Sequence, residues 1–263
     1  MPVNATAFVF GEGPTDKIVF DFLKENFFSL NAGRLQPFVV VGGKNNFRNK
    51  IQQKVQPDIE ARRQDVFILV FRDRDAGEEA EQIIQSFENI VCELLSPWNI
   101  TPPSAQKISE SIYKWDVLPT TPVHPGFRFV LHIANNERLS LPMTLRNHTT
   151  DGYVLASGLL DSVLNRFAEE VKFVKEVSEP REVLYKLVTQ SISAVMQGEG
   201  VEFSEDKDFL AAYLVATRFW VVKRTEEKER LVKIILDRAI RYAQNEVEQI
   251  FASWIQAINE VLR

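Results

Sequence analysis

The chain has 263 residues and a net charge of −5, with 45% hydrophobic and 25% charged residues. It is long enough to bury a core in one large domain or two, and its acidic balance argues against a protein that coats nucleic acid. We find no apolar stretch of transmembrane length and no secretory signal at the start, so we expect a cytoplasmic protein without membrane contact. The single cysteine, Cys92, is expected to be a buried thiol on a helix.

The first expected strand ends in a glutamate that lies between two glycines. Residues 7–10 form an apolar run with the length of a buried strand and no polar alternation. Thr15 is expected to be the N-cap of the helix that follows, and Asp16 suits the positive end of that helix. Glu12 therefore lies at the carboxyl end of the strand, where ligands bind in open α/β sheets.

A second strand is expected at residues 36–41, and it ends at the turn GGKNNF. A helix from about residue 45 to 56 follows, and the region from residue 44 to 63 is rich in basic side chains. A solvated helix face and a groove for nucleic acid are both consistent with this charge. Four basic residues near the expected catalytic edge are candidate nucleic-acid contacts: Arg48, Lys50, Arg72 and Arg74.

The third strand is expected at residues 66–71, a second uninterrupted apolar run, and it is followed by Asp73-Arg74-Asp75. In extended backbone the two aspartates face one side and the arginine between them faces the other. Together with Glu12 they would place three carboxylates on one sheet edge. Carboxylates that lie close together raise one another's pKa unless a cation neutralises them. Oxygen ligands suit Mg²⁺ or Mn²⁺, which leave coordination positions open for phosphate.

These residues also carry a family resemblance. GEGPTDK at 11–17, followed by VFRDRDAG at 70–77, resembles the two acidic motifs of the TOPRIM domain, which occurs in topoisomerases, bacterial primases, small RNA-maturing nucleases and OLD-type nucleases. GGKNNF at 42–47 is similar to the second strand-loop of small TOPRIM-like proteins. SGLLDSVL at 157–164 is weakly similar to a later segment of that group. The resemblance covers roughly residues 1–165 and implies a Rossmann-like fold.

The resemblance also implies residue roles. Asp73 and Asp75 would be metal ligands, and Glu12 the general acid/base or a metal-linked glutamate. The family often has a further acid two positions after Asp-x-Asp, but that position is Gly77 here, which leaves a second metal ion open. Three further acids are candidates for auxiliary roles: Asp16, Glu78 and Asp161.

The rest of the first half alternates strands and helices. We expect a helix over 78–95, a proline-rich irregular stretch at 96–104, a short strand at 111–118 and a fourth sheet strand at 127–134. Residues 135–152 are expected to be a surface loop, or a lid whose substrate contacts would be Arg138, Arg146 and His148. A helix over 156–174 closes an α/β domain of residues 1–175, which has a mostly parallel sheet of about four strands flanked by helices.

The remaining residues, 176–263, predict an all-α domain. Helices are expected at 181–196 and 207–223, and residues 225–263 contain neither glycine nor proline. Apolar side chains of this last helix form a seam with heptad spacing. The seam is expected to pack within the chain, and self-association into a homodimer through these helices is the alternative. Its members are Leu236, Ile240, Ala243, Val247, Ile250, Trp254, Ala257 and Val261.

The leading functional hypothesis is a metal-dependent nuclease that acts on the phosphodiester bonds of DNA or RNA. Glu12 and the two aspartates would form its site, while Lys44 and one of Arg72 and Arg74 offset charge on the phosphate. A Walker A loop, a nucleophile elbow and an identifiable topoisomerase tyrosine are absent from the sequence. Three alternatives remain. The first is a non-cleaving TOPRIM-like subunit that partners a separate ATPase, as in OLD-like phage defence. The second is nucleotidyl transfer, and the third is a Rossmann-like domain whose acids only cap helices.

Overall fold

The computed structural model describes residues 6–61, 64–119, 125–170, 179–220 and 228–263. Its sheet has six strands in the order β2-β1-β3-β6-β5-β4, of which the first four are parallel and the last two are antiparallel. The strands are β1 (Ala7–Gly11), β2 (Val39–Val40), β3 (Val66–Arg72), β4 (Gln106–Ser109), β5 (Ile112–Val117) and β6 (Phe127–Ile133). The predicted α/β class is confirmed, and the sheet has two strands more than the four expected.

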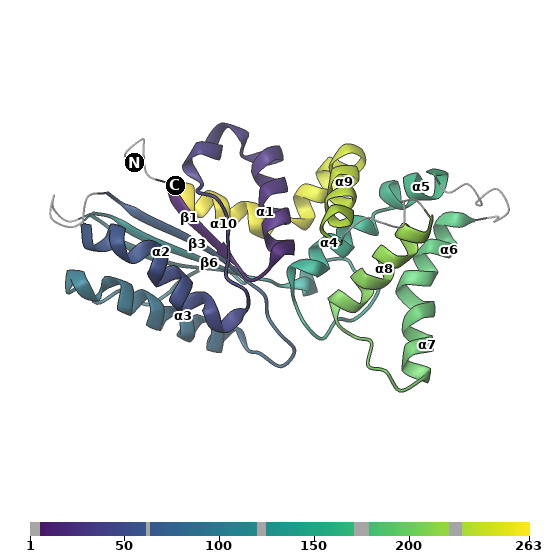
Figure 1. Cartoon of the computed structure of the whole chain (residues 1–263), viewed down its shortest axis with the longest axis horizontal. Coiled ribbons are helices and arrows are strands. Elements are labelled where there is room, and N and C mark those ends of the chain that lie inside the picture. The colour runs from purple at the N-terminus through teal and green to yellow at the C-terminus, as the bar shows by residue number, and fades with distance from the viewer. Residues whose placement is uncertain (1–5, 62–63, 120–124, 171–178, 221–227) are drawn as a thin grey trace. The chain divides into compact units, whose positions relative to one another are not determined.

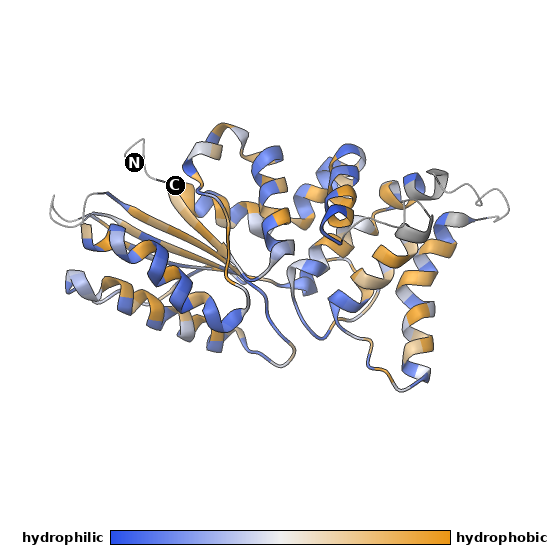
Figure 2. Cartoon of the chain, viewed as in Figure 1, coloured by the Kyte–Doolittle hydropathy of each residue, from blue (hydrophilic) through white to orange (hydrophobic). Residues whose placement is uncertain are grey.

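Helices cover both faces of this sheet, which explains why its central strands have no polar alternation. α2 (Phe47–Ala61) and α3 (Ala80–Leu95) lie on one face, and α1 (Pro14–Phe27) and α10 (Ala252–Leu262) lie on the other (Figure 1). Every residue of β1 and β3 is buried. The strands are accordingly among the most hydrophobic segments of the chain (Figure 2).

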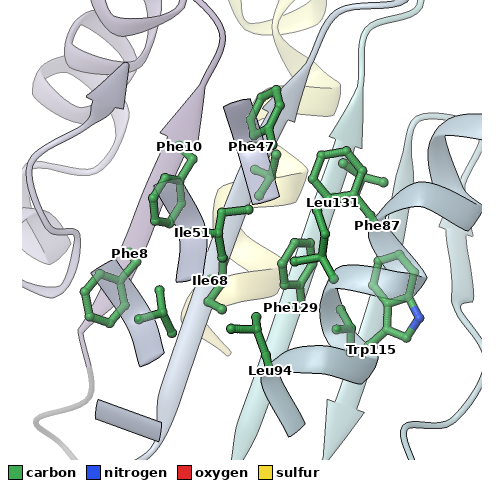
Figure 3. Packing of buried hydrophobic residues seen from close by; sticks show 14 of the residues in the cluster. Phe8, Phe10, Phe47, Ile51, Ile68, Phe87, Leu94, Trp115, Phe129 and Leu131 are labelled. Carbon is green, nitrogen blue, oxygen red and sulfur yellow. The ribbon is translucent and has the colours of Figure 1, made fainter. Parts of the chain in front are cut away.

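The main core lies between the sheet and the pair α2 and α3 (Figure 3). Phe8 and Phe10 of β1 and Ile68 of β3 face Ile51 of α2 and Phe87 of α3 across this layer. On the opposite face, Phe71 of β3 stacks on Trp254 of α10, with 3.8 Å between ring centroids. Side chains of alternate residues in a strand point to opposite faces, so both layers draw on the same apolar runs.

The start of α1 differs from the sequence prediction. Gly13 is the N-cap and Pro14 occupies the first turn, so Thr15 is already inside the helix. Asp16 supplies the cap from within, because its buried carboxylate accepts a hydrogen bond of 2.9 Å from the Gly13 N–H. Proline at the first helical position loses no hydrogen bond, which favours this earlier start. Cys92 is also a correction, since it lies on the outer face of α3 and is exposed rather than buried.

The chain divides into two compact units by its contacts. Unit 1 comprises residues 1–74, 78–134 and 252–263, and unit 2 comprises 75–77 and 135–251. The expected boundary near residue 175 differs from this division, because residues 135–170 group with unit 2 and because α10 packs on β3 and β6 and thus belongs with the sheet. Unit 2 is helical, and its α-helices are α4 (Thr150–Gly158), α5 (Asp161–Glu170), α6 (Pro180–Lys186), α7 (Ile192–Gly198), α8 (Asp206–Trp220) and α9 (Lys228–Ile250).

Two of the long helices expected from the sequence are divided. The helix predicted over 156–174 is α4 and α5, which are separate around Leu159, and residues 171–174 lie outside the described ranges. The last predicted helix has a non-helical residue at Ala243 (φ −148°, ψ 42°) and is interrupted between α9 and α10. Six of its eight seam residues are buried within the chain, which confirms the expectation of internal packing. Among the described residues, no helix is long and apolar enough to cross a membrane.

Candidate functional site at the carboxyl edge of the sheet

The ends of β1 and β3 bring an arginine, and not three carboxylates, to the centre of the expected site. The parallel register pairs Phe10 with Val70, so Glu12 and Arg72 lie at the same level just beyond that pair. Arg72 Nη1 donates to Glu12 Oε1 and to the carbonyl of Asp73. Its Nη2 donates to both carboxylate oxygens of Glu78, each at 2.9 Å.

Arg72 is only 4% exposed and its guanidinium is paired inside the protein, so its role as a nucleic-acid contact stays a prediction. Its side chain follows the alternation of β3, which places Arg72 on the same face as Ile68 and Val70, beneath α2 and α3. A buried guanidinium must be paired with acceptors, and two carboxylates and one carbonyl provide them. The sequence carried a signal for this, because Arg72 directly continues the apolar run.

The three predicted metal ligands have different environments. Glu12 is half-buried and held by Arg72, Asp73 is half-buried immediately after β3, and Asp75 is exposed at the start of the stretch 75–77 that groups with unit 2. Across the described residues, no three His, Cys, Asp or Glu side chains form a group that could hold a metal ion. Carboxylate oxygens remain suitable donors for Mg²⁺, and Arg72 competes with such an ion for Glu12.

Lys44, which was predicted to offset charge on the phosphate, lies near this edge of the sheet. Gly42 and Gly43 have φ of 76° and 111°, conformations that favour glycine, and they turn the chain from β2 toward the start of α2. The Gly42 N–H donates to the Glu12 carbonyl at 3.0 Å, which fastens this turn to the end of β1. Lys44 Nζ is 3.8 Å from Glu78 Oε1 and its side chain is 44% exposed, so the ammonium is accessible from solvent.

A pocket of about 350 Å³ opens between α2 and α3, and Lys44, Arg72 and Glu78 form part of its lining. We call it the α2–α3 pocket. Arg48 also lines it and forms an ion pair with Glu93 across the two helices. The other two predicted nucleic-acid contacts are not part of the pocket lining: Lys50 is exposed on α2 and Arg74 is half-buried after β3.

The predicted auxiliary acids have structural partners. Asp16 is buried as the cap of α1, and Glu78 holds Arg72 from the segment before α3. Asp161 begins α5 in unit 2, where it forms an ion pair with Arg181. A polar stripe on α3 lines the α2–α3 pocket and was not predicted from the sequence. Its residues are Gln82, Ser86 and Asn89, and their helical spacing was visible in the sequence.

Within unit 2, a buried carboxylate holds the segment 135–152 against the start of α8. Asp206, at the start of α8, accepts hydrogen bonds from the side chains of Asn136 and Asn147 and from both the N–H and the hydroxyl of Thr149, at 2.6–3.0 Å. Burial of this carboxyl raises the pKa of Asp206. His148, expected to contact substrate from a lid, is instead buried and accepts from the Asn136 N–H at 3.0 Å.

No protein-family model and no curated protein matches the chain. Among solved structures, it is similar to the hypothetical protein PH0156 from Pyrococcus horikoshii OT3. The TM-score is 0.54 at 13% sequence identity, and the alignment covers 99% of this chain and 100% of that chain. At this identity, the likeness shows a shared fold.

Proposed function

We propose that this protein is a metal-dependent nuclease of the TOPRIM-like type, which cuts phosphodiester bonds of DNA or RNA. One observation carries the proposal. Glu12 and Asp73 directly follow the adjacent parallel strands β1 and β3, at the sheet edge where Lys44 also lies. Ligands bind at this edge in open α/β folds, and acids placed there suit metal-assisted phosphoryl chemistry.

In this proposal Glu12, Asp73 and Asp75 are the residues that would hold Mg²⁺ or Mn²⁺, which supplies a Lewis acid for the phosphoryl oxygen. Lys44 attracts the phosphate and offsets the charge that develops on it. Arg72 fixes the rotamer of Glu12 and balances the negative charge of Glu12 and Glu78. Glu12 would be the group that accepts the proton of the attacking water.

The second candidate is a TOPRIM-like subunit that does not cleave and acts beside a separate ATPase. A specific observation favours it. The Glu12 carboxylate is held by a buried arginine, and the described residues contain no ready group of three metal ligands. An edge closed in this way can bind nucleic acid or a partner protein without cutting.

The test is cleavage of single- and double-stranded DNA and RNA in Mg²⁺, Mn²⁺ or EDTA by the wild type and by Glu12→Gln and Asp73→Asn. We expect metal-dependent cutting that each substitution lowers by about 100-fold or more. Glu60→Gln is the matched control, because Glu60 is exposed near the end of α2 that leads into β3, and its activity should equal that of the wild type.

Each other outcome has a defined meaning. Metal binding by calorimetry that requires Glu12 and Asp73, without cutting of any substrate, would support the non-cleaving subunit. Growth of a product with added nucleoside triphosphates would indicate nucleotidyl transfer. Equal activity of Glu12→Gln and wild type, or no metal binding, would refute the proposed site.

A further inference from the structure

The α2–α3 pocket adjoins the proposed cleavage edge, and its size suits a small ligand. Its volume of about 350 Å³ is at the low end of the range typical of ligand pockets. Arg72 and Glu78 contribute to its lining and also to the ion-pair cluster that holds Glu12. A group bound in the pocket would therefore be directly beside the proposed reactive edge.

The floor of the pocket is apolar and rigid. Phe47 and Phe87 meet edge to face, with 5.4 Å between ring centroids, and Ile83 and Ile90 complete this surface. All four are at most 4% exposed, and the two phenylalanines pack into the main core of unit 1 (Figure 3). A floor held by the core is formed before any ligand arrives, which lowers the entropic cost of binding.

One wall of the pocket consists of short polar side chains on α3. Gln82, Ser86 and Asn89 follow one another at intervals of four and three residues, so they share one helix face. All three are exposed and line the pocket, and Asn45 from the segment before α2 is also part of the lining. Amide side chains both donate and accept hydrogen bonds, as the edge of a nucleobase does.

The charged side chains in the lining give it a positive balance. Lys44, Arg48 and Arg72 carry three positive charges against the two negative charges of Glu78 and Glu93. Lys44 lies toward the sheet edge and its side chain is 44% exposed, so this end of the pocket is the favourable one for a phosphate. The apolar floor, the amide wall and the cationic end together match the parts of one nucleotide.

We propose that the α2–α3 pocket binds a single nucleotide, with its base on the apolar floor against Gln82 and Asn89 and its phosphate toward Lys44. The choice of a nucleotide rests on the proposed nuclease function. In that function the bound nucleotide would be the one in the substrate strand next to the phosphodiester bond that is cut. A base held by amides and an apolar surface is the usual way in which proteins read an unpaired nucleotide.

The test is calorimetric titration of the full chain, in EDTA so that nothing is cut, with AMP, CMP, GMP and UMP. Ribose 5-phosphate is the control ligand without a base. We expect at least one monophosphate to bind about tenfold more tightly than ribose 5-phosphate, and the double substitution Gln82→Ala/Asn89→Ala to remove most of this difference. Gln85→Ala is the matched control, because Gln85 is exposed on α3 outside the pocket lining.

A second variant, Ser86→Phe, fills the pocket with a bulky side chain from an exposed helix position, and circular dichroism checks that it is folded. It should abolish nucleotide binding. Equal binding of ribose 5-phosphate and all four monophosphates, or binding unchanged in Ser86→Phe, would overturn the proposal. A single-stranded oligonucleotide that competes with the monophosphate would identify a residue of a strand as the occupant, whereas no competition would identify a free nucleotide.

The two proposals can fail separately. Base-dependent binding without cleavage of any nucleic acid would leave the pocket proposal standing and remove the nuclease. Metal-dependent cleavage that is unaffected by Ser86→Phe and by the amide substitutions would leave the nuclease standing and remove the pocket proposal.

Discussion

Arg72 connects the two acids that the sequence places near the same sheet edge. A guanidinium carries five N–H donors in a fixed plane, and here it reaches Glu12, Glu78 and the Asp73 carbonyl at once. Glu12 could be predicted because it lies directly after a buried strand, whereas Glu78 was only a candidate auxiliary acid. The pairing could not be predicted, because the direction of an arginine side chain at a strand end depends on which face the neighbouring helices cover.

His132 gives a prediction for the pH dependence of stability. The side chain is fully buried on β6, beside the stacked rings of Phe71 and Trp254, and its Nε2 lies 2.9 Å from Ser253 Oγ. Burial lowers the pKa of His132 to about 3, well below the value of about 6.5 in an unfolded chain. Between these two values the unfolded state binds a proton that the folded state does not. The contribution to stability is therefore complete above about pH 6.5 and falls as the pH is lowered toward 3.

The comparison is between wild type and His132→Met, with urea unfolding measured at pH 7, 6 and 5. Below pH 6.5 the wild type should lose up to about 1.4 kcal/mol per pH unit more than the variant, since all other titrating groups are shared. Parallel dependence of the two proteins on pH would mean that folding does not lower the pKa of His132.

At the scale of elements, hydrophobic pattern predicted the central strands well. β1 and β3 are apolar runs buried on both faces, and β6 is mostly apolar with Arg128 and His132 within it. β4 was missed because QKIS is short, polar and at least partly exposed, and only its pairing with β5 makes it a strand. The kink at Ala243 was missed for a related reason, since no glycine or proline marks it.

Asp206 gives a prediction for how the segment 135–152 is attached to α8. One of its oxygens accepts from Asn136 and from the N–H and hydroxyl of Thr149, and the other accepts from Asn147. Asp206→Ala leaves all these buried donors without their acceptor, and we expect a loss of about 3 kcal/mol or more in the free energy of unfolding. Asp206→Asn can keep the three bonds at one oxygen, so its loss should be clearly smaller.

Denaturant unfolding of both variants measures this difference, with Glu199→Ala as an exposed acidic control expected to change stability by less than about 0.5 kcal/mol. Equal losses for the alanine and asparagine variants would show that the carboxylate does not act through these hydrogen bonds.

At the scale of the whole molecule, the sheet unit is assembled from distant parts of the chain. Residues 252–263 return to unit 1 after more than a hundred residues of unit 2. The sequence showed that α10 has an apolar face, but an apolar stripe does not identify the surface that it covers. This is why α10 was assigned to the helical domain 176–263, since helices that follow one another in sequence were assumed to belong together.

The last prediction follows from this return of the chain. α10 covers Phe71 with Trp254, and its C-terminal carbonyls accept from Arg128, at Glu260, and from Arg34, at Leu262. A chain that ends at Phe251 uncovers this face of β3 and β6, and deletion of one large buried aromatic alone typically costs about 3–5 kcal/mol. We therefore expect the shortened chain to bind a hydrophobic dye, to lose cooperative unfolding of the sheet unit and to lose any activity located at the end of β3.

Two controls separate docking of α10 from a general effect of the change. In the full chain, Trp254→Ala should reproduce part of the loss, whereas Gln256→Ala, on the exposed side of α10, should behave as wild type. A synthetic peptide of residues 252–263, added to the shortened chain, should restore cooperative unfolding in proportion to its concentration, because it binds the folded state alone. Cooperative unfolding of the shortened chain without the peptide would contradict this prediction. It would show that the contacts within the sheet and with α1 keep the sheet unit folded without α10.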